Sequence, residues 1–139
     1  MHIEINWLAV AVATFIGTAI AGIWYQEAVF GKAWRKATGV TPKQSKQAGN
    51  SPMGVLLLVN FVTAVALAIL VYISSHFFGN HSVGFALLNG AAAGLALSAT
   101  TLIVHNGFEL KPKKLTFINV AYQLAIFLAM TLVIGLFGV

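Results

Sequence analysis

The sequence lacks cysteine and aspartate altogether, and its only acidic residues are Glu4, Glu27 and Glu109. Without cysteine, disulfides, thiol nucleophiles and cysteine-ligated metal or iron–sulfur sites are excluded. Chemistry that needs two neighbouring carboxylates has at most one pair to use. Only 8% of the 139 residues are charged and 59% are hydrophobic, whereas roughly a quarter of a soluble domain is charged. This imbalance excludes an ordinary soluble domain and predicts an integral membrane protein.

Sequence motifs of known chemistry are also missing. The chain has no Walker loop, no Rossmann glycine pattern, no HExxH and no evident Ser/His/Asp arrangement. His76 and His81 offer two metal ligands without an evident third, so no metal site is predicted. We therefore predict no cofactor. The sequence leaves enzymatic activity open and favours a protein without one.

Long apolar segments are what the sequence does contain. A helix needs about 20 residues to cross roughly 30 Å of hydrocarbon, and a spanning segment must satisfy its own backbone hydrogen bonds. We predict an all-α bundle of four transmembrane helices that forms a single domain over residues 1–139. The first segment also resembles a signal peptide, because Ala19-Ile20-Ala21 is like a cleavage site, but no Lys or Arg precedes it, so we predict a retained helix. The four spans cover about residues 7–26, 53–77, 83–105 and 115–137.

The basic residues predict how the chain is oriented. All eight Lys and Arg lie in two stretches, residues 32–46 and 111–114, which follow the first and third spans. With four spans both stretches fall on one side, and the positive-inside rule places them in the cytoplasm and both termini outside. The net charge of +5 is then a membrane-surface feature. It predicts contact with the lipid bilayer and with anionic lipid headgroups, and no nucleic-acid partner.

The segment after the first span has the pattern of an amphipathic helix over about residues 28–38. Phe30 and Trp34 are four residues apart and share a face, while basic residues occupy the other face. Such a segment is typical of a helix that lies in the membrane interface, and two aromatic residues at the end of the span are typical of the aromatic belt. The predicted membrane-surface residues are Trp24, Tyr25, Phe30, Lys32, Trp34, Arg35 and Lys36.

Small residues predict where the helices pack. Lipid gives helices no hydrophobic reason to associate, so close backbone approach must replace it. In the third span, Gly90, Gly94, Ser98, Thr101 and His105 are spaced by four, four, three and four residues, which predicts one stripe. Gly17 and Ala21 offer a similar face in the first span. Four short helices bury little surface alone, so we also predict a homo-oligomer.

Most of the larger polar groups fall in the cytoplasmic half of the predicted spans. A pocket open to the cytoplasm could form there, but each residue has a simpler explanation. Glu27 could pair with Arg35 or Lys32, a histidine at a helix end often bonds backbone carbonyls, and amides often tie helices together. The candidate ligand-binding residues are Glu27, Asn60, His105, Asn106, Asn119, Tyr122 and Gln123.

Two stretches, NWLAVAVATFIGTAIAGIWYQEAVFGKAW and FINVAYQLAIFLAMTLVIG, resemble the bacterial family called domain of unknown function 1761. Its members are small four-span membrane proteins with a WY…FGKxW segment after the first helix and an INxxYQ-like start to the last. The resemblance covers nearly the whole chain and supports the four spans, but it implies no activity. The predicted localisation is the cytoplasmic (inner) membrane. The first motif is carried by Trp24, Tyr25, Phe30, Gly31, Lys32 and Trp34.

Three functional hypotheses follow from these features. The first is a protein that binds or translocates a small solute or ion through a cytoplasmic-side polar pocket. The second is an accessory or structural subunit that docks a partner protein or anionic lipid through the Phe30/Trp34 segment. The third is a membrane enzyme acting on a lipophilic substrate, with His105 and either Glu109 or Glu27 as acid and base.

The two halves of the chain also share a layout, with Asn60 and Asn119 in similar contexts, which is compatible with two similar helical hairpins.

Overall fold

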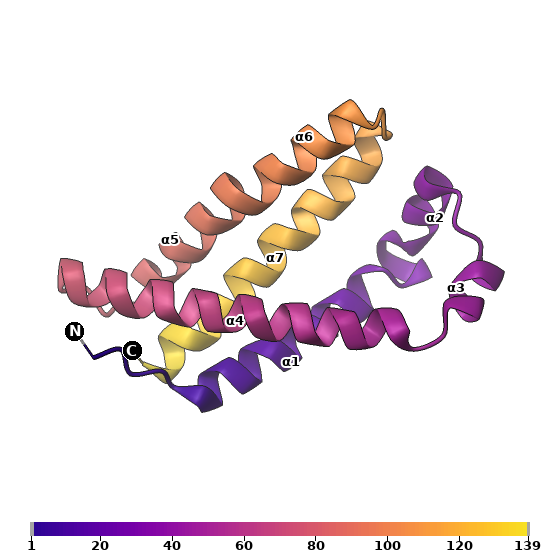
Figure 1. Ribbon diagram of the computed structural model, residues 1–139. Helices are drawn as coiled ribbons and strands as arrows, with labels where there is room; N and C mark the ends of the chain where they lie inside the picture. Colours follow the sequence, from indigo (N-terminus) through magenta and orange to yellow (C-terminus); the bar gives the residue numbers. More distant parts are fainter. Residues whose placement is uncertain (1, 139) are drawn as a thin grey trace.

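The computed structural model describes residues 2–138, and within that range it contains helices and no strand (Figure 1). Four of its helical segments are long and apolar enough to cross a membrane. This confirms the predicted all-α, multi-pass bundle. The four segments are α1 (Trp7–Trp24), α4 (Ser51–Phe78), the continuous helix Val83–Phe108, and α7 (Lys113–Phe137).

The connection between α1 and α4 is helical too. It consists of a π-helical turn, η1 (Glu27–Gly31), followed by α2 (Lys32–Thr38) and α3 (Pro42–Ala48). Thr41 starts α3 with a capping box, in which its hydroxyl accepts from the Gln44 N–H at 3.2 Å and the Gln44 side chain accepts from the Thr41 N–H at 2.9 Å. The predicted amphipathic segment therefore divides into a π-helical turn and a short α-helix.

Helix α7 is the centre of the bundle. It packs against α1 on one side and against the continuous helix 83–108 on the other, and it also contacts α4 and α2 (Figure 1). Its side chains Met130 and Ile134 are buried with Val10 of α1 and Val71 of α4. Because α7 touches every other spanning helix, residues on α7 are best placed to line a site between them.

Glycines allow the closest helix contacts. A Cβ on Gly90 would meet Thr131 and would lie 2.9 Å from the carbonyl oxygen of Phe127, both on α7. A Cβ on Gly94 would lie 3.1 Å from Leu124 of the same helix. Gly17 of α1 likewise has no room for a Cβ beside Met130. The structure thus brings Gly17 of the first span and Gly90 and Gly94 of the third span against α7.

The stripe predicted for the third span is interrupted in the middle of the helix. Between α5 (Val83–Ala93) and α6 (Thr100–Phe108) lies a π-helical stretch, η2 (Gly94–Ala99), in which Ser98 is partly buried. A π-helical stretch inserts an extra residue, and one residue turns an α-helix by about 100°. Beyond η2, Thr101 and His105 are therefore exposed rather than continuing the glycine face.

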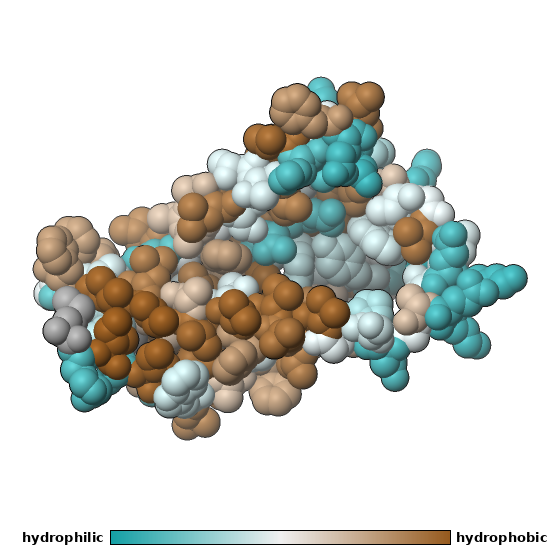
Figure 2. Space-filling model, viewed as in Figure 1, coloured by the Kyte–Doolittle hydropathy of each residue, from teal (hydrophilic) through white to brown (hydrophobic). Residues whose placement is uncertain are grey.

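The two ends of the bundle differ in character. At one end lie both described termini, where the Asn6 side chain donates to the Phe137 carbonyl at 3.5 Å. At the other lie α2, α3, the α6–α7 connection and the start of α7, which together carry all eight Lys and Arg, and Figure 2 shows hydrophilic side chains gathered there. We call it the basic end. That this end faces the cytoplasm stays a prediction.

Candidate functional site

A tight reversal of the chain after α1 builds one wall of the candidate site. Helix α1 ends at Trp24, and the Gln26 carbonyl then accepts both the Val29 N–H at 2.9 Å and the Gly31 N–H at 2.8 Å. A Cβ on Gly31 would lie 2.5 Å from the Tyr25 carbonyl oxygen and 2.6 Å from the Gln26 carbonyl carbon. Because those obstacles are backbone atoms, only glycine fits this turn. The reversal brings α2 against α7.

Aromatic rings fill the space enclosed by the reversal. Trp24 stacks at a tilt on Phe30 with centroids 4.7 Å apart. Tyr25 lies edge to face with Trp34 at 5.8 Å and with Tyr122 of α7 at 5.2 Å, which is a favourable geometry for aromatic pairs. Phe30 and Trp34 are thus half-buried on the protein. They do not form the free apolar face that their spacing indicates, because the tertiary fold turns them inward.

A cavity of about 350 Å³ lies between these rings and α6–α7. We call it the aromatic–amide pocket. Its volume is at the small end of the usual range for small-molecule sites, about 300–1,000 Å³. The Tyr25 hydroxyl donates to Asn119 Oδ1 at 2.8 Å and so joins the end of α1 to α7. The pocket is lined by Tyr25, Trp34, Leu102, Asn119, Tyr122 and Gln123.

The structure brings together some predicted site residues and separates others. Asn119, Tyr122 and Gln123 line the aromatic–amide pocket. Glu27 and His105 are exposed outside it, and His105 borders a separate shallow depression beside α6. Within residues 2–138 neither of these two side chains takes part in a hydrogen bond or ion pair. Glu27 begins η1 and so turns away as the chain reverses, while η2 rotates His105 to the outside.

Asn60 and Asn106 instead tie helices together. The Asn60 amide is 1% exposed and donates to the Thr18 hydroxyl at 3.1 Å, which joins α4 to α1. The Asn106 amide donates to the Thr116 hydroxyl at 3.0 Å, which joins α6 to α7. The surroundings of Asn60 and Asn119 therefore differ, although their sequence contexts are alike.

Charges near the site are not neutralised by acids. Arg35 donates to the Ser45 hydroxyl at 3.0 Å, and its guanidinium lies 5.9 Å from the centroid of the Trp34 ring. Within residues 2–138 one ion pair forms, between Lys111 and Glu109 at 3.6 Å, and both partners are about half exposed, so it adds little stability. The Tyr25 phenol is a neutral hydrogen-bond donor to Asn119.

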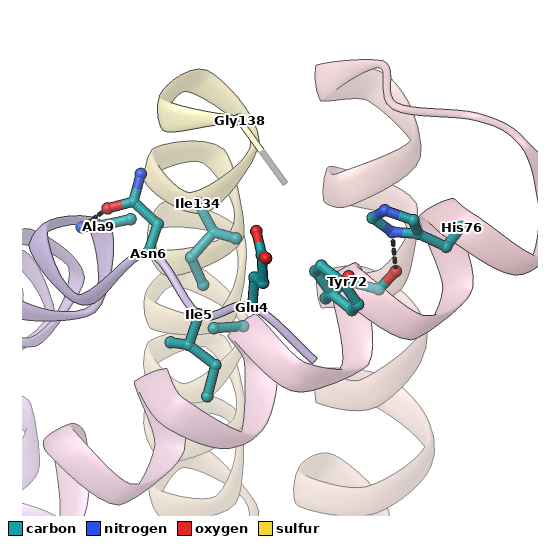
Figure 3. Close-up of a pocket in the computed structure, with 9 residues that line it drawn as sticks. Glu4, Ile5, Asn6, Ala9, Tyr72, His76, Ile134 and Gly138 are labelled. Atoms are coloured by element: carbon teal, nitrogen blue, oxygen red, sulfur yellow. Dashed lines mark hydrogen bonds between the residues drawn. The ribbon is translucent and has the colours of Figure 1, made fainter. Parts of the chain in front are cut away.

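A second cavity of about 370 Å³ lies at the opposite end, where the described termini meet α4. Figure 3 shows Glu4, Asn6, Tyr72 and His76 around it. The Tyr72 hydroxyl donates to the His2 carbonyl at 2.9 Å, and the Tyr72 and His76 rings stack at 4.0 Å. Sequence reasoning missed this cavity, because it depends on a non-helical terminus folding over α4. Across the described residues no three His, Cys, Asp or Glu are grouped to hold a metal ion.

Comparison with known proteins adds a family but no activity. The model of the family described as protein of unknown function (DUF1761) matches residues 8–135, which is nearly the whole chain. No curated protein and no solved structure matches. The residues of the WY…FGKxW motif are those that form the reversal, the aromatic cluster and part of the pocket wall.

Proposed function

We propose, for a chain that belongs to the DUF1761 family, that it binds a small solute in the aromatic–amide pocket and moves it across the membrane. The observation that carries this proposal is the pocket itself. Three aromatic rings and two amides, from three separate parts of the chain, converge on a cavity of about 350 Å³ at the end of the bundle. Convergent polar groups in an aromatic-lined cavity are the usual signature of a small-molecule site. Glu27 and His105 have no part in it, since both lie outside the pocket.

The proposal includes assembly of several copies. A groove of about 430 Å³ runs between α1 and α4, with an almost wholly apolar lining that includes Trp7, Phe15 and Phe61. Gly54 also borders it, and a Cβ there would meet nothing within 4 Å. Small residues at an open helix groove permit close approach of another helix. We therefore place the contact between copies at this groove, and crosslinking in native membranes of a single cysteine introduced at Gly54 tests it. A product at twice the chain mass is expected, and monomer alone would contradict the assembly.

Native mass spectrometry of the protein released in mild detergent tests the binding proposal. We expect a bound small molecule on the wild-type protein that is lost on Asn119→Leu. Asn89→Leu is the matched control, because the Asn89 amide bonds only within its own helix, to the Phe85 carbonyl at 2.8 Å. Retention of the molecule on Asn119→Leu, or its loss on both variants, would contradict binding at this pocket.

A specific observation also favours the accessory-subunit alternative. Every residue of α3 is exposed, including Lys43 and Lys46, and Lys32 and Lys36 are exposed nearby. Each lysine near an anionic surface contributes about 1 kcal/mol of attraction. Under this alternative the spectrum shows retained anionic lipid that is lost on the double substitution Lys43→Gln and Lys46→Gln, while no small molecule is found. The enzyme hypothesis has no comparable support, because no hydrogen bond within residues 2–138 joins His105 to Glu27 or Glu109.

A further inference from the structure

We infer that the ligand of the aromatic–amide pocket is a small organic carboxylate with a flat apolar body. This inference rests on the proposed function and names the chemical class of the solute. Three features of the pocket carry it: the balance of hydrogen-bond donors and acceptors, the shape and polarity of the walls, and the charge around the opening.

The pocket has more free donors than free acceptors. The Tyr25 hydroxyl donates to Asn119 Oδ1, which occupies one of the two lone pairs of that oxygen and leaves the two N–H groups of the amide. Within residues 2–138 no hydrogen bond engages those N–H groups, the Gln123 amide, the Trp34 indole N–H or the Tyr122 hydroxyl. An indole only donates and an amide nitrogen carries two protons, so these groups offer six protons against four acceptor oxygens, those of Gln123, Asn119, Tyr25 and Tyr122. A ligand rich in acceptor atoms satisfies such a site.

The walls between these donors are flat and apolar. Tyr25 and Tyr122 stand edge to face on one side, and Trp34 closes the cavity edge to face with Tyr25. Leu102 completes the lining from α6. A planar body can pack on these rings, while its acceptor atoms meet the amides of α7.

The charge around the site favours an anion. No carboxylate lines the pocket, and its end of the bundle carries all eight Lys and Arg against two acids, Glu27 and Glu109. An excess of positive charge at one end of a protein raises the local concentration of anions there. Aromatic rings alone could attract a cation, but the Arg35 guanidinium already lies 5.9 Å from the Trp34 ring centroid. The surrounding positive charge would repel a second cation.

Fluorine NMR on the full chain in nanodiscs of zwitterionic lipid tests the charge preference with three probes of matched size. They are para-fluorobenzoate, para-fluorobenzamide and para-fluorobenzylammonium. A hydrogen bond to a charged acceptor is stronger than one to a neutral acceptor, so we expect the carboxylate to bind about tenfold tighter than the amide. The ammonium probe is expected to bind more weakly still.

The substitution Asn119→Asp then tests the charge preference of the pocket without changing the shape of the side chain. It replaces two donors with an acceptor and adds a negative charge, so we expect carboxylate binding to weaken at least about tenfold and ammonium binding to strengthen. Asn80→Asp is the matched control, because Asn80 lies at the opposite end of the bundle and its side-chain oxygen accepts from the Ser82 N–H at 3.1 Å, a role that aspartate keeps. Unchanged preference in Asn119→Asp would overturn the assignment.

The remaining outcomes separate this inference from the proposed function. Equal or tighter binding of the amide or the ammonium probe overturns the carboxylate class and leaves a solute site standing. Absence of binding by all three probes overturns the inference, and the solute retained by wild-type protein but not by Asn119→Leu then decides the proposed function. An anionic lipid headgroup presents related chemistry, so the titration is repeated with phosphatidylglycerol in the nanodisc. Loss of carboxylate binding there would assign the pocket to lipid and overturn a soluble ligand.

Discussion

Substitution of Gly31 by alanine tests the reversal that builds the pocket wall. The added Cβ would lie 2.5 Å from the Tyr25 carbonyl oxygen, and ordinary van der Waals contact begins at 3.4 Å. The gap must therefore widen by about 0.9 Å. Two backbone atoms of Gln26 stand within 2.8 Å on the same side, so the turn cannot yield by a side-chain rotation. Backbone shifts of this kind cost about 1–3 kcal/mol, and we expect Gly31→Ala to lower the free energy of unfolding by about 2 kcal/mol.

The assay is SDS-induced unfolding of the purified protein, followed by near-ultraviolet circular dichroism. Trp34 packs edge to face on Tyr25, so opening the turn also changes the aromatic signal before unfolding begins. Gly22→Ala is the control, because a Cβ on Gly22 in α1 would meet nothing within 4 Å. Replacing a helical glycine of this kind stabilises by up to about 1 kcal/mol. If Gly31→Ala matched Gly22→Ala in both stability and spectrum, the steric reasoning would be refuted.

The same unfolding assay checks three more substitutions. Ser75→Ala raises the free energy of unfolding by about 1 kcal/mol, because the buried hydroxyl has no hydrogen-bond partner within residues 2–138; a lower midpoint contradicts this. Gly90→Val lowers the free energy of unfolding by about 2 kcal/mol, because a Cβ would lie 2.9 Å from the Phe127 carbonyl oxygen. A Gly90→Val variant as stable as the wild type would contradict this prediction. Asn60→Leu lowers the free energy of unfolding by about 0.6 kcal/mol because it removes the hydrogen bond to Thr18. Asn60→Asp lowers the free energy of unfolding further because it buries a charge; an aspartate variant more stable than the leucine variant would contradict this reasoning.

The helices were predictable because their cause is local. A run of about 20 apolar residues must be a helix in lipid wherever it lies in a sequence. The approach of Gly90 and Gly94 to α7 follows from the same local pattern, since glycines four apart share a face. The shared face of Asn119 and Gln123 was predictable for the same reason, and both side chains line the aromatic–amide pocket.

The rest of the site depends on contacts that a sequence pattern does not contain. Trp34 reaches the pocket because Gly31 lets the chain turn sharply and because the Tyr25 ring packs edge to face with it. The helical spacing of apolar and basic residues in the sequence instead predicts that this tryptophan faces the lipid surface. Glu27 and His105 attracted attention as rare ionisable groups, yet rarity does not say which way a side chain points. Their positions depend on η1 and η2, and π-helical turns have no sequence signature in a single chain.

The inserted residue in η2 determines which face of α6 the third spanning helix presents to α7. With the insertion present, Leu102 lines the pocket and Asn106 bonds to Thr116 of α7. Regular α-helical winding through Gly94–Ala99, with no residue removed, would rotate α6 by about 100°. Thr101 and His105 would then take the places of the leucine and the asparagine, in line with the glycines of α5. Deleting one residue from η2 would instead remove the insertion and keep Leu102 and Asn106 facing α7. The winding of η2 alone therefore decides which residues of α6 line the pocket.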